Sequence, residues 1–271
     1  MLAEAYVADK YGYSHRKASR LVGLCRATLY YQSTRPDDSP VRARLRELAE
    51  QRLHEMLKRE GLVKNHKRTE RLYAEEKLSL RLRKRKKRAA AVRLQRESPT
   101  GANQRWSMDF IQDTLSTHRR FRALTVIDDY TRECLAIHVD TSIGGVRVSR
   151  VLEQLKETRG LPEAISVDNG PEFAGKALDA WAYMRGVKLD FIRPGKPVEN
   201  CFIESFNGRF RDECLSEHWF ETLEEARQLI ETWRIDYNSV RPHSSLGNLA
   251  PEEFAKQDSI LSSRELYCKV A

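Results

Sequence analysis

The segment that begins at Asn103 alternates strand-like and helix-like patterns, and this alternation restricts the fold more than any other feature of the sequence. Three strand-like runs follow one another with short turns between them, which predicts antiparallel strands over 105–111, 122–127 and 134–139. Helix and strand patterns then alternate along the chain, over 146–159, 164–167, 172–185 and 187–192. The order is βββαβαβ, which predicts one mixed sheet with helices on its faces.

Three antiparallel strands followed by right-handed crossovers to parallel strands are typical of ribonuclease H-like domains, although other α/β folds share this order. In the helix over 172–185, we expect the side chains of Phe173, Ala177, Trp181 and Met184 to face inward. Three more helices complete the segment. They are predicted over 199–215, after a capping box formed by Thr222 and Glu225, and from Pro251 to about Gln257.

The positive charge of the chain is concentrated in its first hundred residues. Residues 1–100 contain 26 Lys and Arg against 12 Asp and Glu, and residues 101–271 contain 22 against 27, within a net charge of +9. A basic front with a mildly acidic remainder favours nucleic acid as the partner of the front. The start of the chain lacks the pattern of an export signal, and no run approaches the ~20 apolar residues of a membrane span, so we expect a cytoplasmic protein with no membrane partner.

Small helical units are predicted in the basic front. Residues 1–33 have a helix-turn-helix outline, in which Arg26 and Thr28 would contact DNA, although a plain helical hairpin fits the same pattern. A second helical unit is expected over 41–78, followed by a basic linker over 79–101. In this linker we expect phosphate contacts from Arg81, Arg83, Lys84, Arg85, Lys86, Lys87 and Arg88, and the alternative is a solvated tether.

Three carboxylates occupy positions that favour a metal site. Asp109 lies within the first predicted strand, Asp168 follows the fourth strand at the carboxyl edge of the sheet, and Glu204 lies on a helical face with Asn207 and Arg211. Each acid alone is weak evidence, because such residues are usually turn or surface positions. Together they would repel one another unless cations neutralise them, which predicts two Mg²⁺ or Mn²⁺ ions and phosphodiester chemistry. Arg211 could hold a phosphate near them or be a surface residue.

At these acids the sequence resembles a known family. Four segments resemble the retroviral-integrase-like (DDE) transposases of bacterial insertion sequences, in particular the second-frame (OrfB) product; they are WSMD from Trp106, VDNGPEF from Val167, PVENCFIESFNGR from Pro197 and YNSVRPHSSLG from Tyr237. The interval of 35 residues between Asp168 and Glu204 is typical of that superfamily. The resemblance runs from about Asn103 to Phe254, so it covers a catalytic core that we place at 102–258, before a tail at 259–271.

The resemblance implies specific roles and partners. Asp109, Asp168 and Glu204 would be the catalytic, metal-binding acids, and Arg211, Asn238, Arg241 and His243 would contact DNA. It also implies DNA cleavage and strand transfer between element ends and target, a homo-multimer on DNA, a first-frame partner protein and association with the nucleoid. The helical unit at 41–78 lacks a short stretch that the family usually has, which leaves two alternatives open: a decayed copy that only binds DNA, and a nuclease that cuts without joining.

Overall fold

The structure is a computed structural model, and it describes residues 2–23, 25, 37–47, 53–78, 98–193 and 200–270, without the side chains of 2–4 and 261–270. Residues 1–44 and 45–271 form two compact units. The first unit contains α1 (Leu2–Tyr11) and α2 (His15–Leu21). Ser14 caps α2, because its hydroxyl accepts the backbone N–H of Lys17 at 3.4 Å. Except for Cys25, the helix predicted after Gly23 lies outside the described residues, as do Arg26 and Thr28.

Three short helices precede the sheet. They are α4 (Ser39–Glu47), α5 (Leu53–Arg59) and α6 (His66–Glu75). Asn65 caps α6 by accepting the N–H of Lys67 at 3.0 Å, as a residue with a short polar side chain does at a helix start. Leu45, Leu57 and Leu72 contribute one fully buried side chain from each helix. The basic run from Arg81 to Arg88 lies outside the described residues.

The sheet has five strands in the order β3-β2-β1-β4-β5, which confirms the predicted ribonuclease H-like arrangement. The strands are β1 (Arg105–Thr114), β2 (Arg120–Asp128), β3 (Cys134–Asp140), β4 (Ala164–Val167) and β5 (Lys188–Phe191). β1, β2 and β3 pair antiparallel, whereas β4 runs parallel to β1 and to β5. β1 is more than twice as long as β4, so its second half extends past the end of its parallel neighbour.

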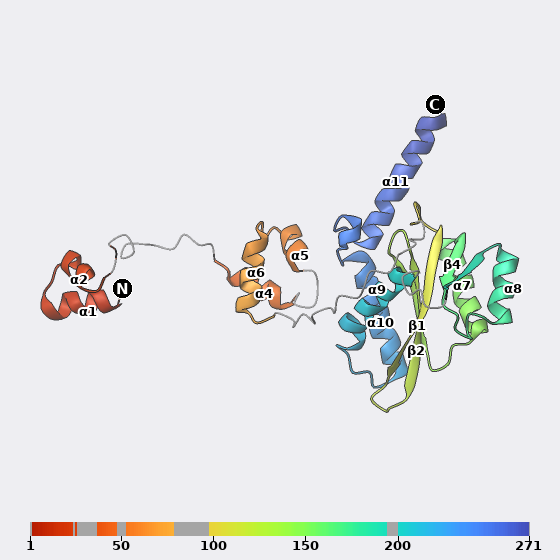
Figure 1. Ribbon diagram of the computed structural model, residues 1–271, viewed down its shortest axis with the longest axis horizontal. Helices are drawn as coiled ribbons and strands as arrows, with labels where there is room; N and C mark the ends of the chain where they lie inside the picture. Colours follow the sequence, from red (N-terminus) through yellow and green to blue (C-terminus); the bar gives the residue numbers. More distant parts are fainter. Residues whose placement is uncertain are drawn as a thin grey trace. The chain divides into compact units, whose positions relative to one another are not determined.

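Helices cover both faces of the sheet (Figure 1). α7 (Gly145–Arg159) and α8 (Lys176–Arg185) pack on one face, around Trp106, Met108 and other apolar residues that alternate along the strands. α9 (Cys201–Phe210) and α10 (Leu223–Ser239) pack on the other face, where Ile111 and Phe121 meet a group of aromatic side chains. Because side chains alternate between faces along β1, Asp109 has the same orientation as Ile111 and lies on the α9 side.

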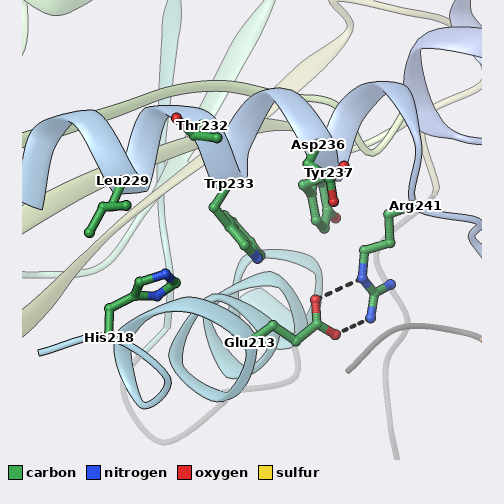
Figure 2. A pocket seen from close by; sticks show the side chains of 8 residues that line it. All are labelled: Glu213, His218, Leu229, Thr232, Trp233, Asp236, Tyr237 and Arg241. Atoms are coloured by element: carbon green, nitrogen blue, oxygen red, sulfur yellow. Dashed lines mark hydrogen bonds and ion pairs between the residues drawn. The ribbon is translucent and has the colours of Figure 1, made fainter. Parts of the chain in front are cut away.

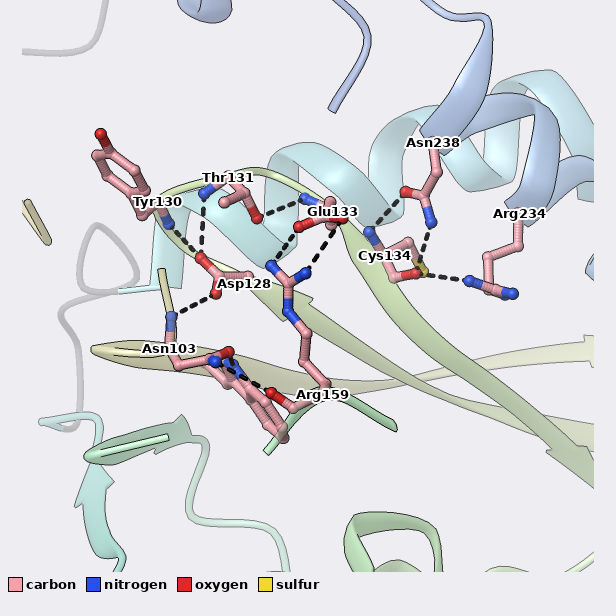
Figure 3. A network of polar contacts seen from close by, with 10 residues as sticks. Asn103, Asp128, Tyr130, Thr131, Glu133, Cys134, Arg159, Arg234 and Asn238 are labelled. Carbon is pink, nitrogen blue, oxygen red and sulfur yellow. Dashed lines mark hydrogen bonds and ion pairs between the residues drawn. The ribbon is translucent and has the colours of Figure 1, made fainter. Parts of the chain in front are cut away.

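The turn from β2 to β3 is fixed by buried carboxylates. Asp128 accepts the backbone N–H groups of Asn103, Tyr130 and Thr131 at 2.8–3.0 Å, so it closes the turn and ties it to the start of β1 (Figure 3). Glu133, the last turn residue, forms an ion pair with Arg159 at the end of α7. Buried charges of this kind are stable only when they are paired and hydrogen-bonded, and both conditions hold here.

Two predicted helix boundaries and one predicted side-chain orientation differ from the structure. α8 begins at Lys176 and not at Glu172, because Phe173 and Ala174 donate to Gly170 in a turn that precedes the helix. Met184 is 72% exposed and not inward, since the buried face of α8 passes through Leu178, Trp181 and Ala182. The last helix, α11 (Pro251–Val270), continues well beyond Gln257.

Candidate active site

Two of the three predicted acids belong to neighbouring segments of the sheet: Asp109 lies on β1, and Asp168 directly follows β4. β4 pairs with β1 in parallel register, with Arg105 opposite Ala164 and Ser107 opposite Ser166. Two residues further along, the same register places Asp168 level with Asp109. Adjacent strands are about 4.8 Å apart, and residues level with each other in register point to the same face. β4 has ended at Val167, so Asp168 stands at the point where the chain leaves the sheet.

The carboxylate of Asp109 is held by two donors. Its Oδ1 accepts the backbone N–H of Phe110 at 2.7 Å, and its Oδ2 accepts Nδ2 of Asn207 at 2.7 Å. Asn207 Oδ1 in turn accepts the hydroxyl of Thr125 at 3.0 Å. Asn207 lies one helical turn after Glu204 on α9, and Thr125 lies opposite Asp109 on β2. This chain of contacts fixes the helix that carries Glu204 against the strand that carries Asp109.

The loop that carries Asp168 is also held at defined points. Asp168 Oδ1 accepts the N–H of Gly170 at 3.0 Å, and Asn169 donates Nδ2 to the carbonyl of Ile192 at 2.8 Å. Gly170 packs closely, because a Cβ atom there would lie 2.9 Å from Asp168 Oδ1. A larger residue at position 170 would therefore displace the Asp168 carboxylate.

Glu204 lies in the first turn of α9, where the positive end of the helix dipole favours a carboxylate. Ile203, Phe206 and Phe210 form the packing face of this helix, and all three are buried. Glu204 is exposed on the other side. Helix 199–215 was predicted as one element, whereas the structure has α9 and then a π-helical segment, η2 (Arg211–Leu215); Glu199 lies outside the described residues.

The other two acids act electrostatically on Asp109. Burial raises the pKa of Asp109, and the negative charges of Asp168 and Glu204 raise it further, against the hydrogen bonds from Phe110 and Asn207. Ionised Asp109 is therefore disfavoured, and a cation would offset this effect. Within the part of the chain that the structure describes, no group of three or more His, Cys, Asp or Glu side chains is close enough together to hold a metal ion. Asp168 and Glu204 both act on Asp109 electrostatically.

The residues of the core that are predicted to contact DNA differ in their exposure. Arg211 is exposed at the first residue of η2 and has no ion pair within the described ranges. Asn238 is half-buried, and its side chain accepts the N–H of Cys134 and donates to the Cys134 carbonyl, at 2.8 and 2.9 Å (Figure 3). Arg241 and His243 are 6% and 3% exposed. Within the described residues these three side chains have a structural role, and their contact with DNA stays a prediction.

Arg241 illustrates that role. Its Nε donates to Glu213 Oε2 at 2.8 Å and its Nη2 to Glu213 Oε1, so a buried ion pair ties the end of α10 to η2 (Figure 2). The same residues line a cavity of about 280 Å³ together with His218, Trp233 and Tyr237. None of the three acids lines this cavity, so it is not the candidate active site.

Sequence reasoning missed a fourth carboxylate near the acids and its partner. Glu172, four residues after Asp168, forms an ion pair with Arg122 of β2. The signal was present in the strand pattern, since Arg122 alternates with Leu124 and Val126 on the core-facing side of β2. Asn207 was predicted to share the face of Glu204, but its contact with Asp109 depends on the packing of α9 on the sheet.

None of the helices in the described ranges is both long and apolar enough to span a membrane. Comparisons with known proteins agree with the fold. Residues 99–197 and residues 185–251 match two family descriptions of the integrase core domain. A chain of a simian T-cell lymphotropic virus intasome has the same fold, with a TM-score of 0.50, 14% identity and coverage of 60% of each chain.

Proteins of bacterial insertion elements are much more similar in sequence. A 31.7 kDa protein of insertion element IS407 from Burkholderia multivorans is 48% identical over 258 residues, which span 92% of this chain and 93% of the relative. A 39.2 kDa protein of IS476 from Xanthomonas euvesicatoria is 45% identical over 250 residues, which span 89% of this chain and 72% of the relative. The chain therefore belongs to the insertion-sequence transposases of the retroviral-integrase-like superfamily.

Proposed function

We propose that this protein cuts and joins DNA with Asp109, Asp168 and Glu204 as the carboxylates that hold two Mg²⁺ or Mn²⁺ ions. The observation that carries the proposal is the register of β1 and β4, which, extended by two residues, brings Asp168 level with Asp109. Carboxylate oxygens are the ligands that Mg²⁺ prefers. The raised pKa of Asp109 fits a cation as well, because burial and the charges of Asp168 and Glu204 disfavour its ionised form, which a cation would stabilise.

The protein residues prepare the site in separate ways. Phe110 and Asn207 orient Asp109, the turn at Gly170 orients Asp168, and the first turn of α9 presents Glu204. When bound, a pair of divalent cations supplies activation of an attacking oxygen and stabilisation of the leaving oxygen. The exposed side chain of Glu204 has the freedom to turn toward the two aspartates. Arg211 would steady a phosphate group beside them.

We extend the proposal to the DNA substrates and to the partners of the protein. The DNA substrates would be the ends of the element and a target, and two ends imply a multimer assembled on DNA. The related intasome chain supports this assembly by analogy of fold. A first-frame protein and the basic run from Arg81 to Arg88 would contribute to DNA binding, in association with the nucleoid.

A strand-transfer assay tests the proposal. The full chain is incubated with labelled end DNA, target DNA and Mg²⁺ or Mn²⁺, beside Asp168→Asn, which removes one ligand charge with little change of shape. Joined product from the wild type and not from the variant supports transposition. Cleavage without joining would identify a nuclease, and neither product would identify a copy that only binds DNA.

A further inference from the structure

The carboxylate of Glu172 lies next to the candidate active site but is already paired. Arg122 Nη1 donates to Glu172 Oε1 from β2, which is two strands away from β4. The Arg122 side chain therefore crosses β1, and its guanidinium lies 4.3 Å from the centre of the Phe110 ring. That ring stacks on Phe173 at 4.9 Å. An ion pair and two aromatic contacts thus join β2 to the loop after β4.

This connection ends close to Asp168. A Cβ atom at Gly170 would lie 2.9 Å from Asp168 Oδ1 and 3.3 Å from Glu172 Oε2, so both carboxylates crowd the same glycine. Gly170 N–H also donates to Asp168 Oδ1. A displacement of Glu172 would therefore move the short turn on which the Asp168 carboxylate depends.

Each of the two charged side chains depends on the other. The side chains of Arg122 and Glu172 are only 24% and 21% exposed, so each would be left as a poorly solvated charge without the other. Arg122 Nε is buried and has no hydrogen-bond partner within the described residues. The contact with Glu172 is thus the main polar anchor of this guanidinium.

We propose that Arg122 and Glu172 are positioning residues that hold the loop after β4 in the position, relative to β1, at which Asp168 can bind a cation. The proposal rests on the proposed function in assigning Asp168 to the cation site. Neither residue needs to touch DNA or the cations. The pair acts through the turn from Asp168 to Phe173, which it fixes across β1 against β2.

The test uses a variant that removes the pair and keeps the local net charge, R122Q/E172Q, beside the exchanged pair R122E/E172R. The matched control is E133Q/R159Q, which removes an ion pair of similar exposure, 12% and 26%, at the β2–β3 turn. Two properties of the free protein are measured: amide hydrogen exchange of the segment 166–173, and the affinity for Mn²⁺ alone.

We expect R122Q/E172Q to exchange faster in this segment and to bind Mn²⁺ about 10-fold more weakly, the scale of other residues that orient metal ligands. R122E/E172R should recover part of both effects, and the control should change neither property. Equal exchange and equal Mn²⁺ affinity in R122Q/E172Q and the control would overturn the proposal. Failure of Asp168→Asn to abolish strand transfer would overturn the proposed function instead, so the two failures are distinguishable.

Discussion

Asp109 has an environment that disfavours its charge. It is half-buried on β1, accepts two hydrogen bonds and is repelled electrostatically by Asp168 and Glu204. Burial raises its pKa, so the unfolded chain releases this proton at lower pH than the folded protein does. The contribution of this group to folding stability therefore falls as the pH rises through the interval between the two pKa values, and it stays low above that interval.

Asp109→Asn should consequently make the metal-free protein more stable at pH 7. Its advantage should shrink as the pH falls through the interval between the two pKa values and should vanish below the ordinary pKa of 3.8 for aspartate, where the wild-type carboxyl is protonated in both states. Urea unfolding at several pH values measures both effects, and Asp113→Asn on the same strand is the control. A variant that is less stable than the wild type at pH 7 would contradict this electrostatic account.

Gly170→Ala should separate activity from stability. The added Cβ meets Asp168 Oδ1, the end of a side chain that can move, so the decrease in folding stability should stay below about 1 kcal/mol. The displaced carboxylate should lower strand transfer by about 10- to 100-fold. In the control Gly175→Ala, the new Cβ would lie 3.6 Å from its nearest neighbour, an ordinary contact. Equal activity of the two variants would show that Asp168 tolerates the displacement.

At the scale of elements, the C-terminal end of α10 is anchored to the sheet through the backbone of Cys134. Asn238 and Arg234 both donate to the carbonyl of Cys134, at 2.9 Å, and Asn238 also accepts its N–H (Figure 3). Cys134 opens β3, so these contacts fix the end of α10 at the first residue of that strand. Arg241 fixes the next turn of chain to η2. The segment from Tyr237 to Gly247 thus joins three elements.

Asn238→Ala should therefore lower the free energy of unfolding by about 1–3 kcal/mol, because the Cys134 N–H is left without its acceptor. Chemical denaturation checks the decrease. At temperatures where the variant is folded, the dependence of DNA affinity on salt should equal that of the wild type, since no phosphate contact has been removed. A reduced salt slope with unchanged stability would restore the DNA-contact role expected from the sequence.

Over the whole molecule, the charge is divided between a basic front and a mildly acidic core. The run from Arg81 to Arg88 contains seven positive charges and precedes the catalytic core in sequence. Such a run attracts phosphates whatever its conformation, because counterion release depends on charge. We therefore expect this front to supply affinity for DNA while the core supplies chemistry.

Replacing these basic residues by glutamine should weaken DNA binding and flatten its salt dependence, by roughly 0.9 in the logarithmic slope for each phosphate that is no longer neutralised. Filter binding or fluorescence anisotropy between about 50 and 200 mM salt measures the slope. Arg150→Gln on α7 provides a control for a single exposed charge. An unchanged slope would indicate that this run is a solvated tether without phosphate contacts.

The sequence predicted the order of strands and helices along the chain and the positions of two acids of the site, because hydrophobic periodicity and turn residues are local signals. It placed Asp109 on a strand and Asp168 at a strand end, and the structure agrees. It could not supply the register between β1 and β4, the contact of Asn207 with Asp109 or the ion pair of Arg122. These depend on how distant segments pack. Met184 shows the same limit, because its exposure depends on which face of α8 meets the sheet.

Only three residues of β4 pair with β1. The register of two paired strands can change only by whole residues. A slip of one residue would shift Asp168 by about 3.3 Å and turn it to the opposite side of the sheet. The gain or loss of a single codon within this short strand should therefore abolish the alignment of the two aspartates completely and not in part.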